Sequence, residues 1–295
     1  NDGRTRRARR HADEAFKRIL DWWESDGKRS GVQLAVISDH GHGEVAAHYD
    51  LKQKLIEGGW KVLTGAQLRQ GASLDENDLV MVGDYTLGLW LTHPSEANLV
   101  RLRDELMAID EVGMIFSQPK QNAEVNEIEG QVPGTFSEAL IFSDHERGPD
   151  LRVTMRNNPK TGRLIMGPSL EIGTGNHGGL LPQEINSVLA IQGDCFQAQK
   201  LQHSEPAGHD DFAVTVMTVM GLMDKDKLLQ PVPAARVLSE AIVNCDLGST
   251  EEEVFRLKEG SFEQYIRRVR FADRVYVTEG ARDGVCTIAA LNKME

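Results

Sequence analysis

Two glycine-rich segments carry the side chains of this sequence that are best suited to bind a metal ion. The first reads SDHGHG over residues 38–43 and follows directly on the apolar, β-branched stretch 32–37. A carboxylate oxygen of Asp39 and an imidazole nitrogen of His40 are ligand atoms that a divalent cation such as zinc accepts. The two glycines remove side-chain bulk where a substrate would approach. We therefore predict that Asp39 and His40 bind a metal ion.

His177 lies in the second segment, which reads GTGNHGG over residues 173–179 and is soon followed by the apolar stretch 187–191. It is 177 − 40 = 137 positions away from His40. One histidine in a loop has little weight, but two histidines in glycine loops beside predicted strands favour a shared site. We predict that His177 is also a metal ligand.

A second interpretation stays open for each of these residues. Asp39 could cap the turn that follows the strand, and His40 would then be a surface histidine. His42 lies near the predicted metal site and could contact a substrate or hydrogen-bond a ligand, but we favour the interpretation that it is an exposed loop histidine. The choice depends on which other elements approach this loop.

Helix-like and strand-like segments alternate along the chain, which is typical of an α/β protein. The stretch 32–37 is apolar on both faces, as in a buried strand of a parallel sheet, where ligands gather at the carboxyl ends of the strands. The apolar spacing over residues 12–23 predicts an amphipathic helix, and Ser95 can cap a second helix over 96–109. Residues 224–295 are predicted to form a helical extension that ends in a short strand.

The composition excludes several functional classes. The chain has 295 residues, with 33 lysines and arginines against 45 aspartates and glutamates, so its formal charge is −12. This acidity argues against general binding of nucleic acid or anionic membranes, despite an arginine cluster at residues 4–10. The longest uncharged apolar run, 212–223, is well short of the roughly 20 residues that cross a bilayer. Three dispersed cysteines indicate no disulfide framework, so we expect a cytoplasmic location.

Three motifs follow one another along the chain: SDHGHGE at 38–44, GNHGG at 175–179 and DFAVTVMTVMG at 211–221. In this order the sequence resembles the nucleotide pyrophosphatase/phosphodiesterase branch of the alkaline phosphatase superfamily, over about residues 5–222. The resemblance implies a three-layer α/β fold with a mostly parallel sheet flanked by helices. It also implies an inserted α+β cap segment at roughly residues 60–165.

The resemblance further implies hydrolysis of phosphate esters by two divalent metal ions, commonly zinc, with manganese as the alternative. Asp39 and His40 would bind one ion and His177 the other. The reaction would pass through a covalent phospho-threonine or phospho-serine. The family places this nucleophile and its remaining metal ligands upstream of the first predicted helix, so we expect them outside this chain. Asp211 and Thr215 match positions in a core helix, and we interpret both as structural.

These observations predict the carboxyl-terminal portion of a phosphodiesterase or nucleotide pyrophosphatase that acts on a small phosphate ester or a nucleotide. Residues 1–223 would form the catalytic domain and residues 224–295 the extension, and the partner would be a second copy or an N-terminal portion. Phosphomonoesterases, sulfatases and phosphonatases of the superfamily share these ligands and stay open as alternatives. A non-catalytic α/β module that serves in binding or as a scaffold also stays open.

Overall fold

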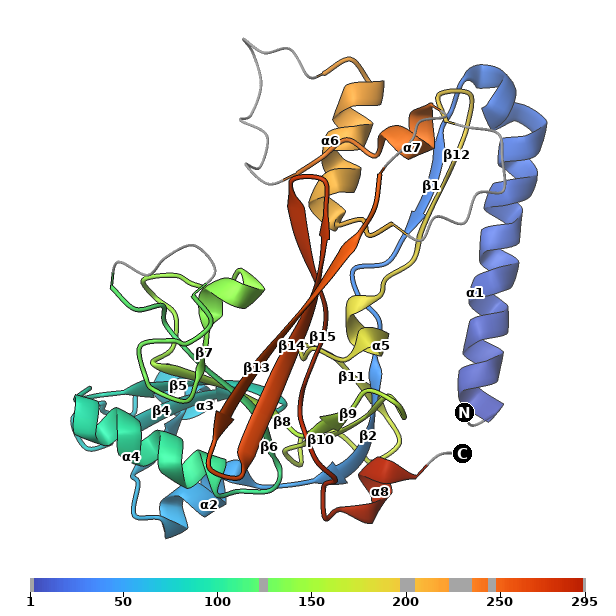
Figure 1. Ribbon diagram of the computed structural model, residues 1–295. Helices are drawn as coiled ribbons and strands as arrows, with labels where there is room; N and C mark the ends of the chain where they lie inside the picture. Colours follow the sequence, from blue (N-terminus) through green and yellow to red (C-terminus); the bar gives the residue numbers. More distant parts are fainter. Residues whose placement is uncertain (1–2, 122–126, 197–204, 223–234, 244–247, 294–295) are drawn as a thin grey trace. The chain divides into compact units, whose positions relative to one another are not determined.

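The protein is a mixed α/β protein in the computed structural model (Figure 1). The structure describes residues 3–121, 127–196, 205–222, 235–243 and 248–293. The chain divides into two compact units. The first unit comprises residues 1–39, 187–251 and 270–276, and the second comprises residues 40–186, 252–269 and 277–295. Within the described ranges, no helix has both the length and the apolar character needed to cross a bilayer.

The first unit contains a long helix and a two-stranded sheet. Helix α1 (Gly3–Trp22) confirms the predicted amphipathic helix and continues into the π-helical turn η1 (Trp23–Gly27). The indole of the buried Trp23 donates a hydrogen bond to the Val32 carbonyl at 2.8 Å, which ties the helix to the chain entering the sheet. The other elements of this unit are η2 (Lys28–Ser30), β1 (Leu34–Ile37), β12 (Leu189–Gln192), α6 (His209–Val219) and α7 (Ser239–Ile242).

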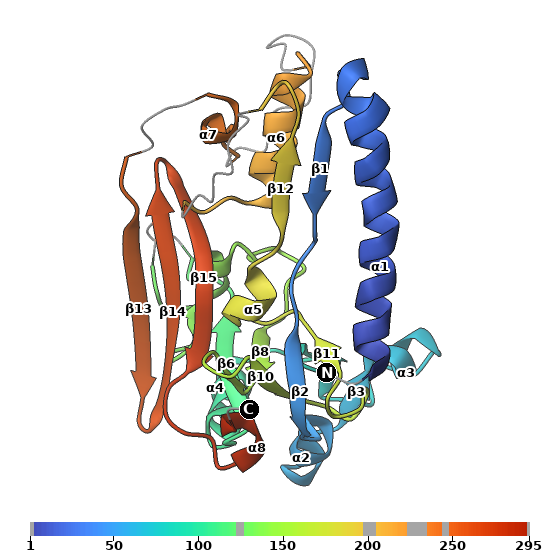
Figure 2. The same ribbon diagram turned by 90° about the vertical axis from the view of Figure 1, so that its right-hand side faces the viewer.

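Strand β1 corrects the prediction of a buried parallel strand. It pairs antiparallel with β12, as Figure 2 shows, and its residues alternate between half-buried and exposed. The physical reason is that a short apolar run fits several burial states, because it does not encode which strands lie beside it. The prediction of a strand at this position is nevertheless confirmed.

Helix α6 is anchored by hydrogen bonds inside the first unit. The fully buried carboxylate of Asp211 accepts bonds from the backbone N–H of Arg236 and from the hydroxyl of Tyr276, both at 2.8 Å. The buried Thr215 hydroxyl accepts a bond from the Leu238 N–H at 2.8 Å. Asp211 and Thr215 thus satisfy buried backbone groups, which agrees with the structural role predicted for them.

The second unit holds a six-stranded sheet in the order β3-β4-β5-β8-β6-β7 and a four-stranded sheet in the order β11-β2-β10-β9. A third sheet, β13-β14-β15, lies mostly in this unit, whereas its first residue, Glu251, and the hairpin tip at residues 270–276 group with the first unit. The elements are β2 (Gly43–His48), α2 (Leu51–Glu57), β3 (Val62–Thr64), α3 (Gly65–Arg69), β4 (Leu79–Gly83), β5 (Thr86–Leu91), α4 (Glu96–Met107), β6 (Val112–Ser117), β7 (Phe136–Ser137), η3 (Glu138–Ile141), β8 (Leu151–Met155), β9 (Asn157–Asn158), β10 (Arg163–Met166), β11 (Gly175–Asn176), α5 (Pro182–Ile185), β13 (Glu251–Glu259), β14 (Phe262–Phe271), β15 (Arg274–Arg282) and α8 (Ala289–Asn292).

The six-stranded sheet has apolar side chains on both faces, which strand β6 illustrates. Its Ile115 belongs to the core that also contains Leu102 and Leu106 of α4, whereas its Phe116 belongs to a separate core with Ile266 of β14. Successive residues of a strand point to opposite faces, so one face packs against helices and the other against the β13–β15 sheet. The predicted Ser95 cap is confirmed, since its side chain accepts a bond from the Asn98 N–H.

The predicted mostly parallel sheet is wrong for this chain, because the sheets are mixed. In the six-stranded sheet, β4–β5, β5–β8 and β8–β6 are antiparallel, and β3–β4 and β6–β7 are parallel. The connection from β4 to β5 is a tight turn after Gly83, which has a φ of +109°. A turn this short can join only antiparallel neighbours, whereas parallel strands need a long crossover.

The C-terminal region also differs from the prediction. The described part of the predicted helical extension 224–295 consists mainly of β13, β14 and β15, with only the four-residue helices α7 and α8. Residues 224–234, 244–247 and 294–295 of it lie outside the described residues. Along β14, buried positions alternate with half-buried ones, as expected of a strand covering a core. The range predicted as a cap, about residues 60–165, forms the six-stranded sheet in the same compact unit as His40 and His177.

Candidate metal centre

Three imidazoles gather at one place in the second unit. The rings of His40 and His177 stack with a centroid separation of 3.7 Å and an interplanar angle of 23°. His42 meets both rings edge-on, with centroid separations of 5.1 Å to His40 and 5.4 Å to His177. One nitrogen of each ring lies within 4.8 Å of the others. The cluster therefore unites both glycine-rich segments identified in the sequence.

The pairing of β2 with β11 explains why segments so distant in sequence meet here. These strands run antiparallel, with Gly175 opposite Glu44 and Asn176 opposite Gly43. The next pair in this register is His177 and His42, which places the two side chains beside each other just beyond the strand ends. Strand β2 is itself held from its other edge by β10, with which it pairs in parallel.

A hydrogen bond orients the His40 ring. Its Nδ1 lies 2.8 Å from the carbonyl oxygen of Gly41. Because a carbonyl only accepts hydrogen bonds, Nδ1 must carry the proton in the neutral ring, and Nε2 then keeps the lone pair that a metal ion needs. A backbone carbonyl behind a histidine is the arrangement that fixes the tautomer of metal-binding imidazoles.

The donor set of the cluster fits a zinc ion. Imidazole nitrogens bind zinc at about 2.0–2.1 Å, and three histidines with one open position form a known type of catalytic zinc site. His40 is half-buried, while His42 and His177 are exposed, so an ion could enter from solvent. The structure thus brings His42, which was expected only near the site, into the set of candidate ligands.

Asp39, the fourth residue of the predicted site, is exposed and belongs to the first unit. The cluster of three histidines lies wholly in the second unit, and the boundary between the units falls between Asp39 and His40. The role of Asp39 as a metal ligand therefore stays a prediction.

The glycines of the SDHGHG segment have a different role from the one expected. A Cβ atom on Gly41 would lie 2.0 Å from the carbonyl oxygen of Gln183, and a Cβ atom on Gly43 would lie 2.8 Å from side-chain atoms of Leu164 and Leu181. Glycine is needed at both positions because α5 and core side chains pack directly against the backbone there. The expectation that these glycines leave space for a substrate is therefore wrong.

Sequence reasoning missed the buried residues behind the cluster. Glu184 of α5 is 3% exposed and accepts hydrogen bonds from the Leu181 N–H and the Tyr85 hydroxyl, both at 3.1 Å. The half-buried Thr86 donates from its hydroxyl to the carbonyl of Gly178 at 2.6 Å. The sequence does contain a signal for α5, because a proline at the first helical position and a glutamate at the third mark a helix start.

The Glu184 and Tyr85 side chains are electrostatically linked. Burial raises the pKa of the Glu184 carboxyl, although hydrogen bonds from Leu181, Tyr85 and Gly179 and the nearby His40 act in the opposite direction. Burial also raises the pKa of the Tyr85 phenol well above its ordinary value, and the adjacent carboxylate adds to this shift. Tyr85 therefore keeps its proton and remains a donor to Glu184.

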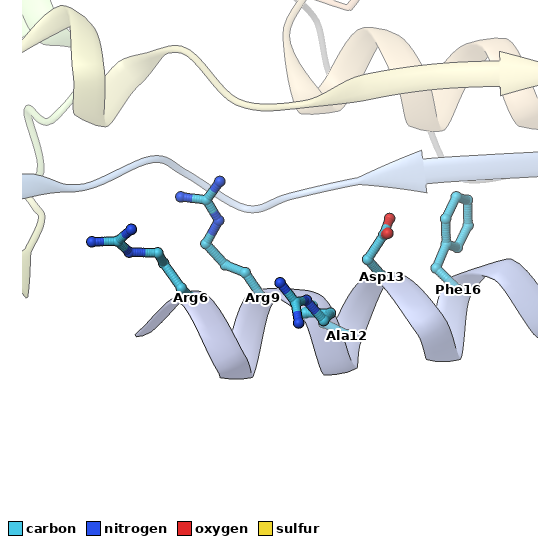
Figure 3. Close-up of a pocket in the computed structure, with 6 residues that line it drawn as sticks. Arg6, Arg9, Ala12, Asp13 and Phe16 are labelled. Atoms are coloured by element: carbon cyan, nitrogen blue, oxygen red, sulfur yellow. The ribbon is translucent and has the colours of Figure 1, made fainter. Parts of the chain in front are cut away.

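A concave surface lies along α1 in the first unit (Figure 3). Arg6, Arg9 and Phe16 project from one side of the helix and line it together with residues 10, 12 and 13. Every one of these residues comes from the same helix. They offer no converging set of metal-binding or nucleophilic groups, so the histidine cluster remains the candidate site.

Comparisons of the chain with protein-family models, with curated proteins and with solved structures found no match.

Proposed function

We propose that this chain carries part of the active site of a metal-dependent hydrolase of phosphate esters, of the phosphodiesterase or nucleotide pyrophosphatase type found in the alkaline phosphatase superfamily. The stacking of His40 on His177 at 3.7 Å carries this proposal. It supports the resemblance at the two motifs that would supply metal ligands, although they are 137 positions apart in the sequence. A small phosphate ester or nucleotide is the proposed substrate, and a cytoplasmic location remains part of the proposal.

The chain's own residues would hold and orient the metal ions. His40 offers Nε2 because its Nδ1 is engaged by the Gly41 carbonyl. His42, which directly precedes β2, and His177, which directly follows β11, each offer one ring nitrogen. Zinc bound there would polarise a phosphoryl oxygen and stabilise the negative charge that develops during phosphoryl transfer. Asp39 would complete the ligands, and the Ser or Thr nucleophile is proposed to lie outside this chain.

The net charge of −12 does not oppose an anionic substrate in this proposal. A bound divalent cation is the largest local charge in such a site and determines the local potential. Uncatalysed hydrolysis of phosphate esters is among the slowest of biological reactions, so a site with metal ions suits this chemistry.

The test measures hydrolysis of three p-nitrophenyl substrates, a phosphodiester, a phosphomonoester and a sulfate ester, by the intact protein loaded with zinc or manganese. We expect the diester to react fastest. His177→Ala and Asp39→Ala should each abolish the reaction, because each removes a metal ligand, while circular dichroism should show an unchanged fold. Equal rates in the wild type and in His177→Ala would overturn the proposal. Faster hydrolysis of the monoester or the sulfate ester than of the diester would assign the enzyme to that substrate class instead.

One observation favours a second candidate, a metal-binding α/β module without hydrolytic activity. Among the described residues, the histidines form the one cluster of three or more possible metal ligands, which suffices for one ion rather than two. For this module we expect the intact protein to bind one equivalent of zinc and to hydrolyse none of the three substrates. Measurable hydrolysis that depends on His177 would exclude it.

A further inference from the structure

Glu184 contacts both histidine-bearing segments at once. Its backbone carbonyl accepts a hydrogen bond from the N–H of Gly41, the neighbour of His40, at 2.8 Å. Its carboxylate accepts bonds from the N–H groups of Leu181 at 3.1 Å and Gly179 at 3.4 Å, and Gly179 lies two positions after His177. A single buried residue thus fixes the backbone on both sides of the cluster.

Tyr85, which directly precedes strand β5, supports this arrangement from behind. The Tyr85 hydroxyl donates to Glu184 Oε2 and accepts a bond from Asn157 Nδ2 at 3.3 Å. A Cβ atom on Gly179 would lie 2.3 Å from the Tyr85 hydroxyl oxygen, so the loop after His177 packs directly on this tyrosine. The loop therefore has little freedom to shift while Glu184 and Tyr85 remain bonded.

The surroundings of Glu184 differ from those of another buried glutamate in the same unit. Glu138 is fully buried and forms two hydrogen bonds with the guanidinium of Arg152, at 3.0 and 3.2 Å. The hydrogen-bond donors to Glu184 in the described structure are Tyr85 and backbone amides, and none is an arginine or lysine. A buried carboxylate without a cationic partner is costly, and these three hydrogen bonds offset part of that cost. The Glu184 carboxylate is therefore held by the backbone next to His177 and by Tyr85, not by an arginine or lysine.

We propose that Glu184 is a positioning residue that fixes the separation of the metal-binding histidines His40 and His177, acting through Gly41 and Gly179. This inference rests on the proposed function. Residues behind the ligands of a metal site fix the orientation of those ligands, and their loss typically lowers metal affinity about 10–100-fold. A site held by backbone hydrogen bonds also loses less side-chain freedom when the ion binds.

The experiment compares Glu184→Gln with Glu138→Gln in the full chain. Zinc affinity is measured by competition with a chromophoric chelator, and ligand geometry by the visible absorption of bound Co²⁺. We expect Glu184→Gln to lower zinc affinity about 10–100-fold and to alter the Co²⁺ spectrum. Glu138→Gln removes a buried ion pair of the same unit, so it should lower the melting temperature but leave zinc affinity within about 3-fold of the wild type.

The outcomes separate this inference from the proposed function. Zinc binding by the wild type that is lost in His177→Ala but unchanged in Glu184→Gln would overturn the positioning role alone. Absence of zinc binding by the wild type would instead overturn the metal site. The ring resonances of His40 and His177 in the metal-free chain would then decide the positioning role, since Glu184→Gln should shift them and Glu138→Gln should not. If Glu184→Gln does not fold, Tyr85→Phe removes one bond to the carboxylate and should give a smaller loss of the same kind.

Discussion

The backbone carbonyl of Gln183 occupies the space where a side chain at Gly41 would begin. A Cβ atom at residue 41 would lie 2.0 Å from that oxygen, far inside van der Waals contact. Gly41→Ala should therefore push α5 away from the loop, break the bond from the residue 41 N–H to Glu184, and lower the free energy of unfolding by about 1–3 kcal/mol. Urea unfolding and zinc titration together measure this effect, and zinc affinity should fall in parallel.

Gly175→Ala is the matched control for this prediction. A Cβ atom there would lie 3.4 Å from the nearest His42 atoms, which is ordinary contact. We expect its stability to stay within about 0.5 kcal/mol of the wild type. Equal effects of the two substitutions would show that the close approach of α5 is not what requires glycine at residue 41.

His42 should prove to be a direct metal ligand rather than a neighbour of the site. Loss of a residue behind the ligands costs about 10–100-fold in metal affinity, so His42→Ala should cost more than about 100-fold. His48→Ala is the control, because the His48 ring bonds the Leu170 carbonyl and lies outside the cluster. Isothermal titration with zinc measures both variants. A decrease in zinc affinity of less than about 3-fold in His42→Ala would show that His42 lies beside the site without binding the ion.

Gln264 should be important for stability although it lies far from the histidines in sequence. Its fully buried amide accepts a bond from the Ile115 N–H at 3.0 Å and donates to the Gly134 carbonyl at 3.2 Å. Gln264→Leu leaves these backbone groups unpaired in the core, so we expect a loss of about 2–4 kcal/mol in urea unfolding. Gln53→Leu on the exposed face of α2 should change stability by less than about 0.5 kcal/mol. Similar losses in both variants would contradict the role of Gln264 as a partner of buried backbone groups.

Glu129 should make part of the stability depend on pH. The Gly134 N–H donates to its carboxylate and lowers its pKa below the usual 4.5, partial burial opposes this, and Lys120 lowers it further. A depressed pKa stabilises the fold above the unfolded-state value and loses this contribution as the pH falls through the folded-state value. The stability advantage of the wild type over Glu129→Gln, measured in urea, should therefore shrink between pH 7 and about pH 3. We expect this decrease to be less than about 1 kcal/mol, because the Glu129 and Lys120 side chains are partly exposed.

Lys120→Met provides the control for this pH dependence. It removes the cation but keeps the Gly134 hydrogen bond, which has the largest effect on the pKa of Glu129. The variant should therefore retain most of the pH dependence. A constant difference between the wild type and Glu129→Gln across this pH range would refute the shift.

The local elements and the candidate ligands could be predicted from the sequence alone. The Ser95 cap and the apolar spacing of the first helix required only neighbours within a few residues, so their patterns were sufficient. His40 and His177 could be chosen because a ligand type in a glycine loop after a strand is a local feature. The alternating pattern of β14 was also present, but it was mistaken for part of a helical extension.

Features that depend on which distant segments become neighbours could be found only in the folded structure. The antiparallel register of β11 on β2 brings His42 beside His177, and no pattern near either residue encodes that register. The role of Glu184 arises because α5 packs between the two glycine loops and its bonds join residues far apart in the chain. Periodicity records whether a residue faces the core, whereas strand partners and buried contacts follow from the packing of the whole unit.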